Sequence, residues 1–426
     1  MKFGFQHIVL STALFGLTAP VAMAQSVDNP FLRGRYTAVT ERSQGDFDPE
    51  PLRAGAFEIW SSLGLAAAYN SNIFAAAKDA DNDTNDTIIS ISPQIAAQSN
   101  WSSHELNAGF SLERRDYLKF ETETVTDYDA FVGGRIDVLR DFALRGQAFA
   151  GHGSEPRFEP GSAGAATPIE FDRTGVNAGA VYQRDRFQLE GTGGTIDSDY
   201  DSTTDFRDVT DNFISVRVSY AISPDVAAFL QGRTGDLDYD APGTTDNPNR
   251  DGTRSSVEVG ASFELQAPFR GEIAVGSFRD EKDSPSFVDS QGLSVDANLV
   301  WFPTQLTTVT FRANRGAFDA GIRQSSTATN TTLAVRVDHE LRRNIIIFAE
   351  VGRGNYKFEG SVLLPVQRPL DRKDEFSNVE AGIAYKLNKR ARLEASYRFH
   401  SQSSTGIDRD RDLEQHVVSV GLRIYP

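Results

Sequence analysis

The chain has 426 residues, no cysteine, and 59 acidic against 43 basic side chains, which gives a formal net charge of −16 at pH 7. Nucleic acid is disfavoured as a partner, because phosphate binding requires a basic footprint. Without cysteine, the chain has neither disulfides nor thiols for metal or redox chemistry.

The first 24 residues have the features of a cleavable secretory signal. Lys2 precedes a short apolar run over residues 8–17, and the small-residue sequence Ala22-Met23-Ala24 stands before Gln25. We expect cleavage after Ala24, because a membrane-spanning helix needs about 20 apolar residues and this run is shorter. No later run approaches that length, which leaves a soluble periplasmic protein or an outer-membrane barrel.

Residues 25–55 show no regular period and contain Pro30, Pro49 and Pro51 among glycine and charged residues. We predict an irregular periplasmic segment here, because proline and glycine interrupt regular structure. A docking segment for a partner is the alternative function of this stretch.

From residue 56 to residue 426 apolar and polar residues alternate. In the last segment one face holds Val418, Val420, Leu422 and Ile424, and residues 257–265 and 293–301 show the same separation. In a membrane barrel one strand face meets lipid and the other meets the lumen. The two-residue period therefore predicts transmembrane strands and disagrees with a helical stripe.

Short turns recur about every 40 residues, with longer polar segments between them. The short turns fall at residues 101–103, 139–141, 184–186, 223–225, 267–268, 302–304, 342–344 and 388–390, and the long segments include 79–86, 154–172, 240–253 and 364–374. We predict an all-β, antiparallel outer-membrane barrel of about 18 strands, or about 16, with short periplasmic turns and longer extracellular loops.

A barrel of this size cannot fill its interior with wall side chains, so it is expected to hold a water-filled channel unless loops plug it. The polar strand faces supply charged residues of both signs as candidates to line this lumen. These candidates are Arg217, Glu258, Glu264, Glu272, Asp296, Arg312, Arg336, Asp338, Glu350, Glu380, Lys386, Arg392, Glu394 and Arg398. Pairing across neighbouring strands would also explain them structurally, and the mixture of signs favours a broad hydrated passage over an ion-selective ring.

The sequence Tyr69-Asn70-Ser71-Asn72-Ile73-Phe74, together with residues 50–59, resembles a motif of the putative beta-barrel porins of type 2. The turn periodicity carries the resemblance over nearly all of the mature chain. It implies an outer-membrane barrel often associated with exopolysaccharide production and export. Pro426 departs from the pattern, because barrel C-termini commonly end on the aromatic residue, here Tyr425.

No pattern indicates a catalytic or metal site, so we expect neither an enzyme nor a bound cofactor. The histidines of the mature chain are widely separated, and no spacing specifies a nucleophile with its base. They are His104, His152, His339, His400 and His416.

Asp79, Asp81 and Asp83 resemble the start of a calcium loop, but Thr84 and Ser90 stand where an EF-hand has Gly and Glu. A solvated acidic loop is the simpler interpretation.

Three functions remain open for an outer-membrane protein of this kind. The first is a conduit for a secreted polysaccharide, served by periplasmic polysaccharide-export proteins. The second is a general diffusion porin for small hydrophilic solutes, with one long loop folded inward, and the third is a plugged barrel that displays acidic loops for adhesion. Outer-membrane lipid, lipopolysaccharide and the barrel assembly machinery are expected partners in every case.

Overall fold

The computed structural model describes residues 34–80, 84–162, 164–201, 204–241, 243, 248–358 and 370–426. The predicted signal over residues 1–24, and Asp81 and Asp83 of the acidic loop, lie outside the described residues. Within the described part of the chain, no helix is long and apolar enough to cross a membrane.

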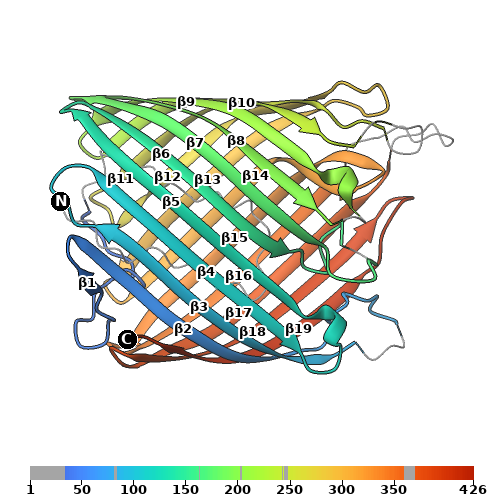
Figure 1. Cartoon of the computed structure of the whole chain (residues 1–426), viewed down its shortest axis with the longest axis horizontal. Coiled ribbons are helices and arrows are strands. Elements are labelled where there is room, and N and C mark those ends of the chain that lie inside the picture. Colours follow the sequence, from blue (N-terminus) through green and yellow to red (C-terminus); the bar gives the residue numbers. More distant parts are fainter. Residues whose placement is uncertain are drawn as a thin grey trace.

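Long antiparallel strands form one closed barrel (Figure 1). Of the 19 strands that the described residues form, all except the short β1 belong to its wall. They are β2 (Phe57–Asn70), β3 (Asp86–Ser99), β4 (Glu105–Tyr117), β5 (Val125–Leu139), β6 (Phe142–Ser154), β7 (Glu170–Arg184), β8 (Phe187–Tyr200), β9 (Val209–Ser223), β10 (Val226–Tyr239), β11 (Gly252–Glu264), β12 (Phe269–Lys282), β13 (Ser290–Thr304), β14 (Thr307–Ile322), β15 (Ser325–Arg342), β16 (Ile345–Phe358), β17 (Lys373–Asn388), β18 (Ala391–Thr405) and β19 (Leu413–Ile424). The predicted barrel of about 18 strands is confirmed.

Each wall strand pairs with the next strand along the chain, and β19 pairs with β2 to close the ring. The short turns gather at one rim, where the C-terminus also lies, and the long loops gather at the other rim (Figure 1). Two 3-10 turns, η1 (Glu121–Glu123) and η2 (Asp205–Arg207), lie at the long-loop rim. The predicted topology places the short-turn rim in the periplasm.

One short strand, β1 (Leu52–Ala54), forms within the segment predicted to be irregular. It folds back on the start of β2, with Ala54 opposite Phe57. Gly55 makes the tight turn feasible, because its φ of 61° is a left-handed conformation that glycine adopts without steric cost. No alternation marks this strand in the sequence, since three residues are too few to show a period.

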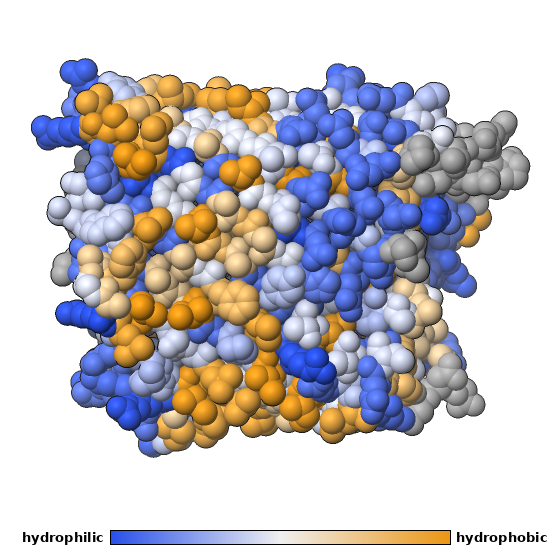
Figure 2. Space-filling model, viewed as in Figure 1, coloured by the Kyte–Doolittle hydropathy of each residue, from blue (hydrophilic) through white to orange (hydrophobic). Residues whose placement is uncertain are grey.

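The outer surface of the wall carries the apolar half of the alternation. Val216, Val259, Leu333, Val351 and Val420 are each between 46% and 63% exposed. Figure 2 shows hydrophobic side chains across the middle and the short-turn side of one face, with hydrophilic ones toward the long loops. Apolar side chains exposed in this pattern are stable only against lipid, which explains why the polar half of each strand points inward.

Candidate functional site

The fourteen candidate lumen residues all lie on β9–β18 and alternate with the apolar outward-facing residues. Several pair with one another across the inner wall. Arg217 on β9 forms two bonds with Glu272 on β12, at 2.7 and 2.8 Å. Arg312 donates to Glu350 at 2.7 Å, and Arg398 donates to Glu380 at 3.0 Å. Each pair neutralises itself within the wall, so this part of the lumen is polar without a dominant sign.

Most of the remaining candidates bond to near neighbours. Arg336 binds Asp338 on its own strand at 3.0 Å and lies 3.6 Å from Glu350. Arg392 lies 2.8 Å from Glu394, which is likewise two residues along its strand.

Two acidic candidates bond to neutral side chains. Glu258 accepts bonds from Gln231, at 2.5 Å, and from Ser294, and Asp296 accepts one from Asn314 at 3.3 Å. The structure does not bring Glu264 and Lys386 into these groups, because both bind the N-terminal segment.

Residues 34–50, here called the periplasmic strap, run inside the short-turn rim along β11–β17. Glu264 accepts the backbone N–H groups of Gly34 at 2.9 Å, of Arg35, and of Tyr36 at 3.3 Å. The ring of Tyr36 stacks on Phe302, with ring centroids 5.2 Å apart. One end of the strap is therefore fixed beneath β11 and β13.

Ion pairs continue along the strap. Arg270 on β12 binds Glu41 at 2.6 Å, Arg42 binds Glu340 on β15 at 3.1 Å, and Lys386 on β17 binds Asp48 at 2.6 Å. Burial raises the pKa of Asp48, but the bonds from Lys386 and the Gln44 backbone outweigh it and hold that pKa below its ordinary value.

Between these ion pairs, the backbone N–H of Val39, a residue only 1% exposed, donates to Thr308 on β14 at 2.9 Å. The wall groups that bind the strap all point into the lumen, so the strap lines the periplasmic mouth and narrows it.

The loop between β6 and β7, residues 155–169, enters the lumen from the other rim and is called the inward loop. Glu155 forms bonds of 2.7 and 3.0 Å with Arg207 of η2, and Arg157 forms bonds of 2.5 and 2.8 Å with Glu123 of η1. All four side chains are at most 8% exposed. Burial, and then the nearby Glu155 carboxylate, raise the pKa of Glu159 to about 8.

The tip of the inward loop contacts a cluster of rings on the wall formed by β16–β18. Phe158 packs on His400 with centroids 4.5 Å apart, and the hydroxyl of Tyr356 donates to Glu159 at 3.5 Å. Phe376 lies between Tyr356 and His400, at 5.0 and 6.4 Å from their rings. The loop thus joins the β6–β7 side of the barrel to the β16–β18 side.

Two adjoining cavities lie beside this contact. The cavity next to Phe158, here called the upper cavity, measures about 190 Å³, and the second cavity measures about 390 Å³. Both are lined by Glu350, Glu380 and Arg398. The upper one is completed by Phe158, Tyr356, Phe376, Asn378, His400, Gln402 and Gln415. These rings and amides were not among the lumen residues predicted from the sequence, although Tyr356 and Phe376 share the inward period of the candidate charges.

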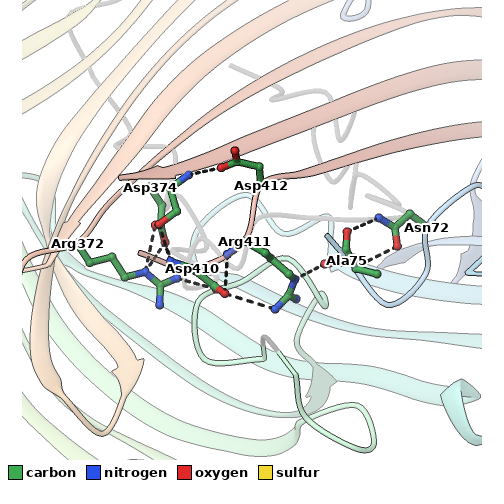
Figure 3. A network of polar contacts seen from close by, with 9 residues as sticks. Asn72, Ala75, Arg372, Asp374, Asp410, Arg411 and Asp412 are labelled. Carbon is green, nitrogen blue, oxygen red and sulfur yellow. Dashed lines mark hydrogen bonds and ion pairs between the residues drawn. The ribbon is translucent and has the colours of Figure 1, made fainter. Parts of the chain in front are cut away.

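The motif at residues 69–74 lies at the seam where β2 meets β19. Ser71 donates its N–H to the carbonyl of His416 at 2.9 Å, and the side chain of Asn72 donates to the carbonyl of Glu414 at 3.1 Å. Figure 3 shows the neighbouring network, in which Arg411 donates to the carbonyl of Ala75. The motif extends the pairing of the first and last wall strands beyond the end of β2, which is a structural role.

The comparisons with known proteins agree with this architecture. The family model described as Putative beta-barrel porin 2 matches residues 44–425. The chain belongs to this family. As a Putative beta-barrel porin 2 protein with a closed 18-strand barrel, it is a porin-like channel of the outer membrane.

The Putative beta-barrel porin 2 chain is also similar to several solved outer-membrane proteins. The FrpB iron transporter from Neisseria meningitidis is 8% identical, with 88% of this chain and 82% of that chain covered and a TM-score of 0.49. The outer membrane protein opdK from Pseudomonas aeruginosa is 11% identical, with 86% and 99% covered and a TM-score of 0.47. At these values the likeness concerns general shape only. A search of curated proteins finds no match.

Proposed function

We propose that this channel is a gated conduit for export of a secreted polysaccharide. The observation that carries the proposal is the pair of adjoining cavities beneath the inward loop. Their lining combines the Glu380–Arg398 ion pair with the amides of Asn378, Gln402 and Gln415 and the half-buried ring of Phe158.

This lining suits a sugar for physical reasons. Amides and paired charges offer planar donors and acceptors to hydroxyl groups, and an aromatic ring offers an apolar surface to the C–H face of a sugar ring. The charges that line the two cavities nearly balance, with five arginines and four glutamates, so the site has no strong net charge that would trap an ionic solute. A polymer passing such a site binds weakly and repeatedly, which is the condition for conduction.

The periplasmic strap supports a gate at the entry side. Its ion pairs with the wall are partly exposed, as at Arg35–Asp225, where the side chains are 30% and 23% exposed. Exposed pairs contribute little individually, because water and dissolved salt screen them. A periplasmic export protein that delivers the polymer could therefore replace them one after another.

The proposal is tested with the mature protein in planar bilayers. We expect small or rare conductance steps in the wild type, and occlusion by long soluble glycans at concentrations where the matching monosaccharides have no effect. Phe158→Ala should weaken the glycan block, whereas Phe263→Ala, which alters an aromatic residue outside the cavity lining, should not. Equal block by monosaccharide and polymer would contradict the proposal, and so would normal surface polysaccharide in a deletion strain.

A second candidate function is a general diffusion porin for small hydrophilic solutes. The inward loop favours it, because a loop folded into the lumen narrows the passage without the need for a regulated partner. This function predicts large, steady conductance steps in the wild type and no selective response to long glycans. The same bilayer recordings therefore distinguish the two functions.

A further inference from the structure

Two groups of outward-facing charges near the long-loop rim have opposite signs. On β14–β17 the outward-facing charged residues near this rim, among the described strand residues, are four cations and one acid. They form what we call the basic face. Its members are Arg315, Arg353, Lys357, Lys373 and Glu375. On β7, β8 and β10 the charges are all acidic and form the acidic face. Its members are Glu170, Asp172, Asp197, Asp199, Asp236 and Asp238.

The basic face continues the lipid-facing rows of the wall toward the long loops. Arg353 lies two residues beyond Val351 on β16, and Val351 is 58% exposed. Glu375 lies four residues from the exposed Val379 on β17. Because successive residues of a strand alternate between faces, these charges share the outward side with the valines. Their place beyond the apolar rows, toward the long loops, is where the headgroup layer of the outer leaflet is expected.

The contacts within the basic face leave an excess of positive charge. Glu375 accepts bonds from both Lys373, at 2.5 Å, and Arg353, at 3.2 Å, so one carboxylate serves two cations. The side chain of Arg353 is nevertheless 74% exposed. Arg315 donates to the neutral hydroxyl of Thr331 at 2.6 Å.

Two of the cations stand directly opposite each other. Lys357 on β16 pairs in register with Lys373 on β17. Like charges directly opposite on neighbouring strands repel each other, and both add to the positive potential of the basic face.

From this geometry we infer that the basic face is a docking surface for the phosphate groups of lipopolysaccharide in the outer leaflet. Phosphate is the anion that the headgroup layer supplies at this depth, and several close phosphates match several close cations. Thr331, Ser377, Ser401 and Ser403 continue the same outward rows and add hydroxyl donors beside the cations. The inference is independent of what passes through the lumen.

The acidic face carries the opposite charge and is the comparison for the basic face. Asp172 stands directly opposite Asp199, and its carboxylate also lies 2.9 Å from a ring nitrogen of His152. Because like charges repel, these carboxylates disfavour the approach of phosphate groups. EDTA in the binding assay removes divalent cations, so that only direct contacts with the cations of the protein are measured.

The experiment measures binding of lipopolysaccharide to the detergent-solubilised full-length mature protein in EDTA. The test variant is Arg353→Ala/Lys357→Ala/Lys373→Ala. The matched control is Arg279→Ala, which removes an outward-facing arginine that also pairs with a glutamate, Glu281, outside the basic face. We expect roughly fivefold weaker binding for each cation removed, no change in the control, and weak binding of dephosphorylated lipid.

Unchanged affinity in the triple variant, or equal binding of phosphorylated and dephosphorylated lipid, would overturn the inference. The other candidate occupant is the acidic face of a second copy. In that case size-exclusion chromatography with light scattering would show an oligomer that the triple variant loses, and the lipid proposal would be wrong. Inorganic phosphate tested at the same concentration separates a lipid site from a site for any phosphate; tight binding of the free ion would also contradict a lipid surface.

Discussion

The periplasmic strap and the inward loop both narrow the lumen with ion pairs between basic side chains and carboxylates, yet the pairs differ in burial. In the inward loop, Arg207 and Glu155 are 6% and 7% exposed. In the strap, Arg270 and Glu41 are 21% and 23% exposed, and Lys389 and Glu50 are 42% and 73% exposed. Water screens exposed ion pairs but not buried ones. Ion pairs therefore fix the inward loop at the long-loop rim and leave the strap displaceable at the short-turn rim.

The largest expected effect comes from breaking a buried pair of the inward loop. Arg207→Ala leaves the Glu155 carboxylate buried beside Glu159 without its partner, at a cost of about 3–5 kcal/mol. We expect the loop to leave the lumen, with larger single-channel conductance and faster proteolytic cleavage within residues 155–162. Arg114→Ala, which removes an exposed pair with Asp116, is the control and should change neither.

A pH dependence of the inward loop follows from Glu159. Its pKa is about 8 in the folded loop against 4.5 for the ordinary side chain. Since the folded pKa is raised, the unfolded loop loses the proton first, and the contribution to docking is complete below about pH 4.5 and lost as the pH rises to about 8. Cleavage of the loop should accelerate over this range.

Glu159→Gln should flatten that pH profile, because the amide stays neutral. Glu155, Arg207 and Tyr356 face the same carboxyl. The variant leaves these neighbours in place, so a change in the profile is due to the Glu159 carboxyl itself. An unchanged profile in the variant would assign the pH dependence to another group.

A smaller effect is expected when the strap loses its anchor. Glu264→Ala removes the acceptor of three consecutive backbone N–H groups, but the exposed residues Gly34 and Arg35 then bond to water, which limits the net loss to about 1.5–3 kcal/mol. We expect a higher frequency of open-channel events in bilayers without a change in thermal stability of the barrel. Should the events stay as rare as in the wild type, the strap would not be a gate.

The smallest effect concerns a single partly exposed pair of the strap. Lys386→Ala removes the bond to Asp48, worth at most about 1 kcal/mol at such a site. The difference from wild type should be visible at about 0.1 M salt and vanish at about 1 M, because salt screens partly exposed charges more than buried ones. The inward loop should show no comparable response to salt, and an equal response would remove the distinction between the two segments.

The barrel and its polar inner face could be predicted because the two-residue period is visible within each strand segment of the sequence. The partners of the inner residues could not. Glu264 and Lys386 carry the inward period, but they bind Gly34 and Asp48, which lie in a stretch without any pattern. Arg207 belongs to a polar loop that looks solvated in the sequence, and it meets Glu155 because the β6–β7 and β8–β9 connections are neighbours at one rim.

The rings of the upper cavity were within reach of sequence reasoning. Tyr356 and Phe376 occupy inward positions of β16 and β17 where a polar residue is the rule. Phe376 also lies over Gly354, where a Cβ would stand 2.4 Å from the ring. A large ring opposite a glycine on the lumen face is a signal of a packed inner wall rather than of an open one.

The seam between β2 and β19 has a consequence for biogenesis. It joins residues near 70 to residues near 416, so its formation requires almost the whole polypeptide to be delivered first. Contacts so distant in sequence are entropically expensive to form and slow. Until Ser71 and Asn72 engage the start of β19, the sheet presents two unpaired edges at which another chain can add. Pairing of the motif with the start of β19 is therefore the last step of barrel closure, and it removes the two unpaired edges.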